Sequence, residues 1–408
     1  MTMSGTLYIA ESESHLVHVV NPQGTNRIFA GGGNDGNGVA ATSASLSHPY
    51  GVAETAAGDI LIVEWSNRIR IVNSSTGIIG SFAGSGIQGF SGDGGPATSA
   101  QLCWPSGIAV TPAGVTLIAD DCNHRIRSVA QDGTISTVVG TGYRGFGGDF
   151  GPALAAHLND PTTVSVTPAG FLLISDRGNH RIRRVDAAGI IVTLVGTGAA
   201  ASTGDGGPAT SASINTPWMA VMSPAGITVI SEEYGHRLRV INTAGIISTL
   251  AGTGFTGFSG DGGSALDAAL SYPCGIVIMP SGAVLFTDGD NSRVRMISLP
   301  TSSSSATLTP TPTSTPYCPI SSFRSLPRMD LVGTLVGTAL SPGMPVPLSS
   351  ESACRQTCCD APFCDGYAFA SGDVSYIIGG PAGCFLYANI SQLIPNSAFS
   401  SGIYESTL

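Results

Sequence analysis

Histidines at one repeated position are the first candidates for chemistry in this chain. They recur at 56-residue steps, and each is followed by an arginine: His124, His180 and His236. Imidazole nitrogen is a common zinc ligand, so three such rings raise the hypothesis of a metal site. Zinc, however, holds its ligands at roughly 2.0–2.1 Å, whereas side chains repeated once per structural unit are kept apart by the symmetry of the units. We therefore expect no metal and no cofactor here.

Carboxylates recur at the same step in two further places. One set lies in Gly-Asp-Gly-Gly phrases or a variant of them: Asp93, Asp149, Asp205 and Asp261. One carboxylate per loop falls short of the roughly six to eight oxygens of a calcium site, so we expect a structural Asx-turn that caps backbone N–H groups. The second set lies five residues before a repeated arginine and predicts a structural carboxylate–arginine pair: Asp120, Asp176, Glu232 and Asp288.

The strongest candidates for binding are the positions where the repeat is broken. Around the repeated prolines (Pro49, Pro105, Pro161, Pro217 and Pro273) the flanking residues differ from copy to copy. Dissimilar aromatic and polar side chains at equivalent positions can form an asymmetric pocket for a small ligand or a sugar. Plain variation in surface loops is the alternative, and it stays open. The predicted ligand-binding residues are Tyr50, Trp104, Asp160, Trp218 and Tyr272.

The elements that position these residues are short strands. In one copy the apolar runs 107–110, 115–119, 125–129 and 134–139 are rich in β-branched residues and are too short for helices. Pro-Ala-Gly and Asp-Gly turns join them into antiparallel hairpins. Four antiparallel strands repeated radially form the blade of a β-propeller.

The copies add up to six blades. Four are complete, and partial copies lie at both ends of the repeat region, so the fold is predicted to be all-β and six-bladed. We expect the fourth strand of blade six and the first strand of blade one to lie upstream of Met1, which means an incomplete N-terminus. The links between blades run to roughly twenty residues and emerge on the same side as the turns between second and third strands. We call that side the loop face and expect binding there.

The local phrases resemble NHL repeats, notably residues 118–127 and 174–183. The resemblance covers residues 5 to 299, and the propeller domain is assigned to 1–299. It implies a six-bladed propeller that serves as a binding platform in most members of the family and as a lyase or hydrolase in a minority.

The composition changes after Leu299. Residues 300–316 form a Ser/Thr/Pro linker, and residues 317–408 form a small disulfide-rich module. This α+β module resembles PAN/apple domains in residues 350–359, 364–369 and 383–387, which implies binding of proteins or carbohydrates. Its disulfide candidates, whose pairing stays open, are Cys318, Cys354, Cys358, Cys359, Cys364 and Cys384.

Charge and cysteine use indicate the setting. With a net charge of −10 and only 11% charged residues, the chain lacks a basic patch for nucleic acid. No apolar run is long enough to cross a bilayer, and no signal peptide is visible. The cysteines, the linker and two glycosylation candidates, Asn73 and Asn389, nevertheless favour an extracellular or cell-surface location. Cys103 and Cys122 fall at one end of the same blade and can pair, whereas Cys274 is expected to stay free.

These observations predict an extracellular recognition or adhesion protein. Its partners would be extracellular proteins or glycans, bound by the loop face and by the PAN/apple-like module. The alternative is a lyase or hydrolase at the channel mouth, which requires His48 and Asp160 to contribute to one ligand set.

Overall fold

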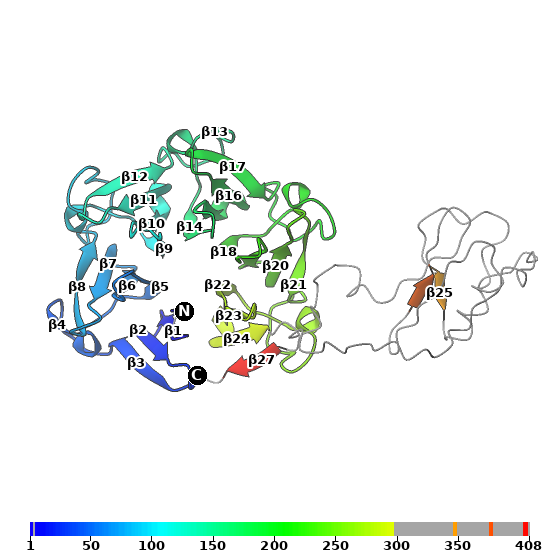
Figure 1. The fold of residues 1–408 in the computed structure, drawn as a ribbon, viewed down its shortest axis with the longest axis horizontal. Coiled ribbons are helices and arrows are strands. Elements are labelled where there is room, and N and C mark those ends of the chain that lie inside the picture. Colours follow the sequence, from blue (N-terminus) through cyan, green and yellow to red (C-terminus); the bar gives the residue numbers. More distant parts are fainter. Residues whose placement is uncertain (3–4, 298–345, 349–374, 378–402, 407–408) are drawn as a thin grey trace, which may run out of the picture. The chain divides into compact units, whose positions relative to one another are not determined.

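The computed structural model describes residues 1–2, 5–297, 346–348, 375–377 and 403–406. Within residues 5–297 and 403–406, six antiparallel sheets stand around a common axis as the blades of a propeller (Figure 1). The first strand of a complete blade lies nearest the axis and the fourth lies at the outside (Figure 1). The predicted all-β, six-bladed architecture is confirmed.

The first three blades follow the predicted order. Blade one contains β1 (Leu7–Glu11), β2 (Leu16–Val20) and β3 (Asn26–Gly31). Blade two contains β5 (Pro49–Glu54), β6 (Ile60–Glu64), β7 (Arg68–Val72) and β8 (Ile78–Ala83), with β4 (Val39–Ala40) added outside β8. Blade three contains β9 (Pro105–Val110), β10 (Thr116–Asp120), β11 (Arg125–Val129) and β12 (Ile135–Val139).

The other three blades repeat the pattern. Blade four contains β14 (Pro161–Val166), β15 (Leu172–Asp176), β16 (Arg181–Val185) and β17 (Ile190–Val195), with β13 (Gly151–Pro152) outside β17. Blade five contains β18 (Pro217–Met222), β19 (Thr228–Glu232), β20 (Arg237–Ile241) and β21 (Ile247–Ala251). Blade six contains β22 (Pro273–Ile278), β23 (Val284–Asp288), β24 (Arg293–Ile297) and β27 (Ile403–Ser406).

Short 3₁₀ turns punctuate the connections. One group lies in the links between blades: η1 (Ala41–Ser43), η2 (Ala97–Ser99), η4 (Ala153–Ala155), η6 (Ala209–Ser211) and η7 (Ala265–Asp267). The other group joins second and third strands: η3 (Asp121–Asn123), η5 (Arg177–Asn179) and η8 (Gly289–Asn291). In the part of the chain that the structure describes, every helix falls short of the length and apolarity needed to span a membrane.

The hydrophobic core lies between neighbouring blades. Leu117 and Ile126 of blade three belong to one buried cluster with Val164 and Ile174 of blade four, and comparable clusters join the other neighbouring pairs from blade one to blade five. The second strands of blades two, three and five (β6, β10 and β19) are buried at all five positions, because neighbouring blades cover both of their faces. A blade therefore depends on its neighbours, as the repeat predicts.

The links between blades also pair with the outer edges of the sheets. Within one link, β13 pairs with β17 at the outer edge of blade four, and the isolated bridge from Pro96 to Thr134 is the equivalent contact in blade three. This pairing protects an edge strand that would otherwise expose free N–H and C=O groups.

The outermost strand of blade six corrects one prediction. We expected it upstream of Met1, and the sequence assigned residues 403–406 to the C-terminal module. The structure instead pairs β27 with β24 in an antiparallel ladder, because an edge strand accepts a partner through backbone groups whatever its side chains.

Most of the predicted C-terminal module lies outside the described residues. This applies to the linker 300–316, to Asn389 and to all six candidate cysteines: Cys318, Cys354, Cys358, Cys359, Cys364 and Cys384. Within 317–408, β25 (Val346–Leu348) pairs antiparallel with β26 (Ser375–Ile377).

Candidate functional site

The residues that precede the repeated prolines share an unusual backbone conformation. Each has a positive φ between 42° and 52°: His48, Trp104, Asp160, Thr216 and Tyr272. The left-handed region is costly for residues with a Cβ atom and persists only where the surroundings hold it. Here the surroundings are supplied by the preceding blade.

One side chain of the preceding blade accepts a hydrogen bond from the backbone N–H of each of these residues. His124 Nδ1 accepts the N–H of Asp160 at 3.2 Å, and His180 Nδ1 accepts that of Thr216 at 3.1 Å. The same contact is made from His15 to His48, from Asn67 to Trp104 and from His236 to Tyr272. Burial lowers the pKa of the His124, His180 and His236 rings, in keeping with a neutral ring whose Nδ1 accepts. These histidines join blades.

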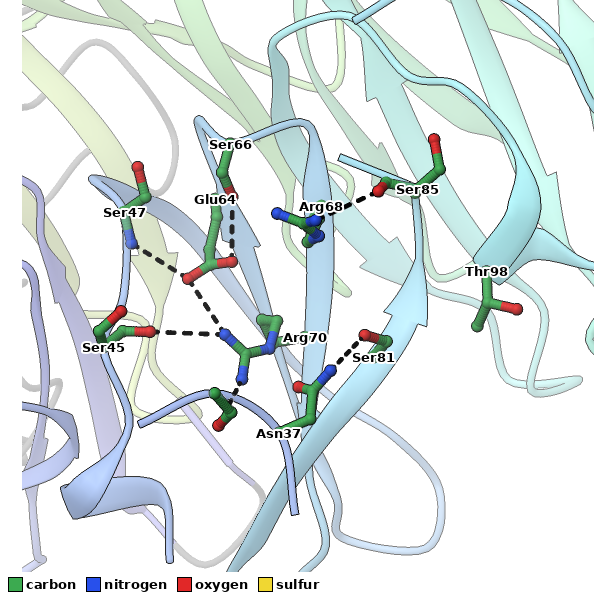
Figure 2. Close-up of a pocket in the computed structure, with 12 residues that line it drawn as sticks. Asn37, Ser45, Ser47, Glu64, Ser66, Arg68, Arg70, Ser81, Ser85 and Thr98 are labelled. Carbon is green, nitrogen blue, oxygen red and sulfur yellow. Dashed lines mark hydrogen bonds and ion pairs between the residues drawn. The ribbon is translucent and has the colours of Figure 1, made fainter. Parts of the chain in front are cut away.

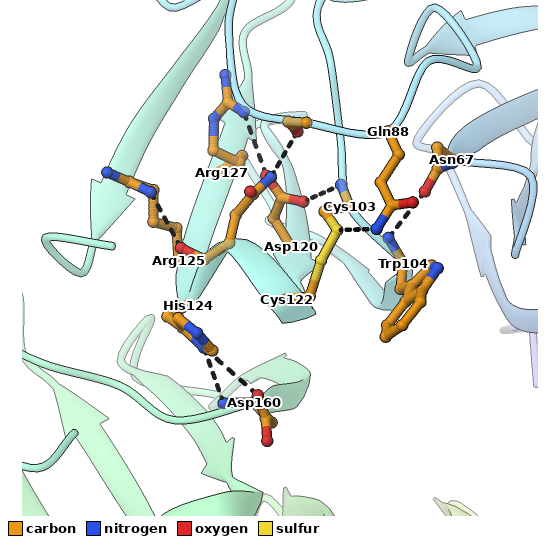
Figure 3. The surroundings of a disulfide bond; sticks show 12 residues. Asn67, Gln88, Cys103, Trp104, Asp120, Cys122, His124, Arg125, Arg127 and Asp160 are labelled. Atoms are coloured by element: carbon orange, nitrogen blue, oxygen red, sulfur yellow. Dashed lines mark hydrogen bonds and ion pairs between the residues drawn. A yellow bond between two sulfur atoms is a disulfide. The ribbon is translucent and has the colours of Figure 1, made fainter. Parts of the chain in front are cut away.

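The repeated carboxylates hold a buried arginine, although a different one from that predicted. In blade three Arg127 lies between Asp120, 3.3 Å away, and Asp93, 2.6 Å away, and Figure 3 shows the Asp120 side of this clamp. Arg125, the predicted partner, instead donates to the Thr141 carbonyl. Asp93 accepts from Arg127 and from a threonine rather than forming the predicted Asx-turn. Both sets of carboxylates are structural.

An aromatic ring covers the paired arginines in three blades. In blade three Phe90 lies 3.7 Å from Arg125 and 4.8 Å from Arg127, measured from ring centroid to Cζ. Phe146 and Phe258 do the same in blades four and six. Such cation–π contacts add to the clamp.

Aromatic side chains gather at the centre of the loop face. Trp65 packs edge-on against Tyr50 at 5.8 Å and against Trp104 at 6.4 Å between ring centroids. Tyr50 of blade two also lies 6.4 Å from Trp218 of blade five, across the axis. All three tryptophans of the chain are therefore connected here. Trp65 and Trp104 remain 43% and 47% exposed, which leaves ring surface for a ligand.

A cation and two tyrosines continue this surface. The Arg177 guanidinium lies 5.8 Å from the Trp218 ring and 5.9 Å from the Tyr234 ring. Its Nε donates to Glu233 Oε2 at 2.9 Å. Tyr234 in turn packs against Tyr272 at 5.1 Å. We call the whole set the mouth, and it consists of Tyr50, Trp65, Trp104, Asp121, Asp160, Arg177, Trp218, Glu233, Tyr234 and Tyr272.

Five mouth residues were missed from the sequence, and all of them except Tyr234 share one repeated position. Trp65, Asp121, Arg177 and Glu233 stand at successive 56-residue steps, each directly after the second strand of its blade. A signal existed, because one repeated position carries an aromatic, an acid, a base and an acid in four consecutive blades. This position lies outside the residues beside the prolines, on which the prediction rested.

The charge state of the mouth depends on Asp121. Burial, reinforced by the negative charge of Asp160, raises the pKa of the Asp121 carboxyl to about 7, although Arg177 opposes the shift. Burial also raises the pKa of Glu233, against the effect of Arg177. The mouth therefore gains negative charge near neutral pH.

The predicted site residues are brought together in part. Tyr50 and Trp218 touch, Trp104 joins them through Trp65, and Tyr272 joins them through Tyr234 and Arg177. The Asp160 carboxylate lies 3.4 Å from His124 Nδ1 and 3.6 Å from Arg144 Nη2. Ligand binding at these residues stays a prediction.

A disulfide fastens one wall of the mouth. Cys103 and Cys122 are bonded, with Cα atoms 5.4 Å apart, so the predicted pairing is confirmed (Figure 3). It ties the residue before Trp104 to the turn that carries Asp121. Cys274 is free, and burial raises the pKa of its thiol. Asn73, the glycosylation candidate, lies in the turn between β7 and β8, on the side opposite to the loop face.

Comparisons with known proteins identify the repeat. A family model described as "Teneurin NHL domain" matches residues 86–145, and one described as "NHL repeat" matches residues 158–185. The propeller contains NHL repeats. This confirms the resemblance seen in the sequence, whereas the PAN/apple-like resemblance stays a prediction.

Two relatives and one structure show how far the similarity of these NHL repeats extends. Teneurin-m of Drosophila melanogaster is 30% identical over 243 residues, which is 53% of this chain and 9% of that protein. Teneurin-4 of Homo sapiens is 30% identical over 239 residues, 50% of this chain and 8% of that protein. The chain thus spans less than a tenth of either relative. An auxiliary nutrient binding protein from Bacteroides thetaiotaomicron shares the fold, with a TM-score of 0.52 and 16% identity over 72% of this chain and 66% of that one.

Proposed function

We propose that this chain is an extracellular recognition or adhesion protein whose mouth binds a protein or a glycan. One observation carries the proposal: partly exposed aromatic rings, including every tryptophan, meet at the centre of one face. Aromatic rings supply flat apolar surface that suits sugar rings and the central residues of protein interfaces. The chain has only 7% aromatic residues, so their concentration here supports a binding role.

The polar centre of the mouth supports the same role. Arg177 and Glu233 present a cation and an anion beside the Trp218 and Tyr234 rings. A few convergent polar groups among aromatic walls are typical of ligand sites, where they orient the bound group.

The Cys103–Cys122 disulfide supports the proposed extracellular location. The Cys103–Cys122 bond forms and persists in oxidising compartments, which fits an extracellular or cell-surface location. NHL propellers of the resembled family act mostly as binding platforms, and the local similarity to teneurins agrees with protein partners. The predicted PAN/apple-like module at 317–408 would add a second binding unit on the same chain.

The lyase or hydrolase alternative gains no support from the geometry. The ring of His48 packs against His15 at 4.3 Å and Trp65 at 5.4 Å, whereas Asp160 lies against His124. Across residues 5–297, no group of three or more His, Cys, Asp or Glu residues is placed to hold a metal ion. Stoichiometric zinc or iron in the purified full chain would nevertheless favour the enzyme.

The test is a binding screen with the full chain. Glycan arrays and capture of secreted proteins identify the partner, and the double variant Trp65→Ala/Trp104→Ala then measures the contribution of the mouth. We expect binding to fall by about 30-fold or more, the loss typical of a central aromatic anchor. Phe150→Gly is the matched control, because it removes a ring that is 84% exposed on a link of the same propeller. Undiminished binding by the double variant would refute the proposal.

A further inference from the structure

Blade two departs from the arginine clamp of the other blades. Asn37 stands 56 residues before Asp93. Its Nδ2 donates to Ser81 Oγ at 2.7 Å, whereas Asp93 Oδ2 accepts from Thr137 Oγ1 at 2.7 Å. Asp93 also accepts two hydrogen bonds from Arg127, at Nε and Nη2. Asn37 accepts none from Arg70, the equivalent arginine. The carboxylate of the clamp is therefore missing in blade two.

The loss leaves one cation without its usual partner. Blade three sets Asp93 and Asp120 against Arg125 and Arg127, two negative charges against two positive ones. The equivalent residues of blade two are Asn37, Glu64, Arg68 and Arg70, which leave the set one negative charge short. The Arg70 side chain is only 7% exposed, yet its Nε has no hydrogen-bond partner among the described residues. A buried donor left unpaired is costly, so the position favours an acceptor.

The aromatic cover is missing as well. Phe90, Phe146 and Phe258 lie over the arginine pairs of blades three, four and six. The link into blade two is shorter, and no aromatic ring of the described chain lies over Arg68 or Arg70. Blade five also lacks the aromatic ring, because Ser202 stands at the position of the phenylalanine. Its arginine, Arg239, likewise has an unpaired Nε. Blade five keeps its carboxylate, however, since Asp205 lies 2.5 Å from Arg239.

A cavity of about 480 Å³ occupies the place of the missing groups (Figure 2). Arg68, Arg70, Glu64 and Asn37 line it, together with several serine side chains. Its volume lies within the range of small-molecule sites, roughly 300–1,000 Å³. The lining contains no mouth residue, so the cavity is distinct from the mouth.

We propose that this cavity binds a small carboxylate that carries an aromatic ring. The carboxylate would lie beside Asn37 and accept from Arg70 Nε, as Asp93 accepts from Arg127 Nε in blade three. The ring would stack on the guanidinium groups of Arg68 and Arg70 as Phe90 stacks on Arg125 and Arg127. The ligand is thus a monoanion of the arylacetate class, which restores both the charge balance and the aromatic cover.

Calorimetric titration of the full chain with phenylacetate tests the proposal. We expect a Kd on the order of 1 mM or lower, since about ten heavy atoms meet a preformed ionic and stacking site. Acetate lacks the ring and benzyl alcohol lacks the charge, so each should bind at least about tenfold more weakly. Absence of saturable phenylacetate binding would overturn the site, and equal binding of acetate would overturn the ligand class.

Asn37→Asp is the decisive variant, because it restores the residue that the other blades carry. We expect the variant to fold and to lose phenylacetate binding by about tenfold or more, since its own carboxylate occupies the site. Asn242→Asp is the matched control: it adds the same charge in a turn where blade four already has Asp186 in the same capping role. Binding that survives in Asn37→Asp, or that is lost equally in Asn242→Asp, would contradict the assignment.

Discussion

Asp121 provides the sharpest test of the electrostatics at the mouth. Its carboxyl is partly buried beside Asp160, and no residue of the described chain donates a hydrogen bond to it. Burial raises its pKa from 3.8 to about 7, with a further contribution from the charge of Asp160. The ionised form is therefore unfavourable in the folded state. The substitution Asp121→Asn exchanges the carboxyl for a neutral amide of the same shape, and it should remove that cost.

The sign and the size of the effect follow from linkage. Because the folded pKa is raised, the stability associated with protonated Asp121 is fully present below the unfolded value of 3.8 and is lost as the pH rises through about 7. A shift of about three units corresponds to at most about 4 kcal/mol, at about 1.4 kcal/mol per unit. Water reaches this partly exposed carboxyl and screens it, so we expect about 1–2 kcal/mol.

Urea denaturation of the full chain at pH 8 and pH 4 measures the difference. Asp121→Asn should have a larger free energy of unfolding than the parent chain at pH 8, and the gain should vanish toward pH 4. Asp267→Asn, the same change at an exposed carboxylate, should have little effect at either pH. A loss of stability in Asp121→Asn at pH 8, or a gain that does not depend on pH, would refute the reasoning.

Three further outcomes test the scaffold. Replacing the disulfide, in Cys103→Ala/Cys122→Ala, should cost about 3 kcal/mol of stability in urea denaturation, the chain-entropy value for a loop with a sequence separation of 19; an unchanged midpoint contradicts this. Arg183→Met should lower the free energy of unfolding by about 3–5 kcal/mol at pH 7.5, because it leaves the buried Asp176 carboxylate without its cation. The loss should be smaller at pH 5, because burial raises the pKa of Asp176 to about 6 and protonation removes its charge. Phe150→Gly should leave stability unchanged or raise it by up to about 1 kcal/mol in thermal unfolding, because Phe150 has a φ of 66° and the ring is exposed; a clear loss argues against it.

The fold was predictable because its signals are local and repeated. The β-branched runs within 107–139 became β9 to β12, and Pro105 marks the start of β9. The outermost strand of blade six was not predictable in this way. Ile403–Ser406 carries none of the repeated phrases, and its pairing with β24 depends on backbone groups alone.

The clamp shows why spacing alone misassigns partners. Asp120 lies directly opposite Arg125 in the β10–β11 ladder, as the five-residue spacing suggests. Its ion pair is nevertheless formed with Arg127, one diagonal step away, while Arg125 donates to the Thr141 carbonyl. Blade five makes the same choice without an aromatic ring, since Glu232 pairs with Arg239 and Arg237 donates to the Thr253 carbonyl. The choice therefore goes with a backbone carbonyl of the link, which the spacing does not encode.

The mouth was predictable only in outline. The prolines indicated where aromatic side chains gather, since Tyr50, Trp104 and Trp218 lie in one connected aromatic surface. Arg177 and Glu233 were missed although their repeated position was visible in the sequence, because the prediction rested on the residues beside the prolines. The comparison of residues across copies reveals which positions vary, whereas their convergence requires the closed ring.

The anchoring of each blade to the next has a consequence for how such a surface diversifies. His180 holds Thr216, and Asn67 holds Trp104, by accepting a hydrogen bond from the main-chain amide. An amide is present whatever the side chain, with proline as the exception, so substitution at these rim positions leaves the anchor intact. The ligand specificity of this surface can therefore change between related proteins while the contacts that join the blades of the propeller are kept.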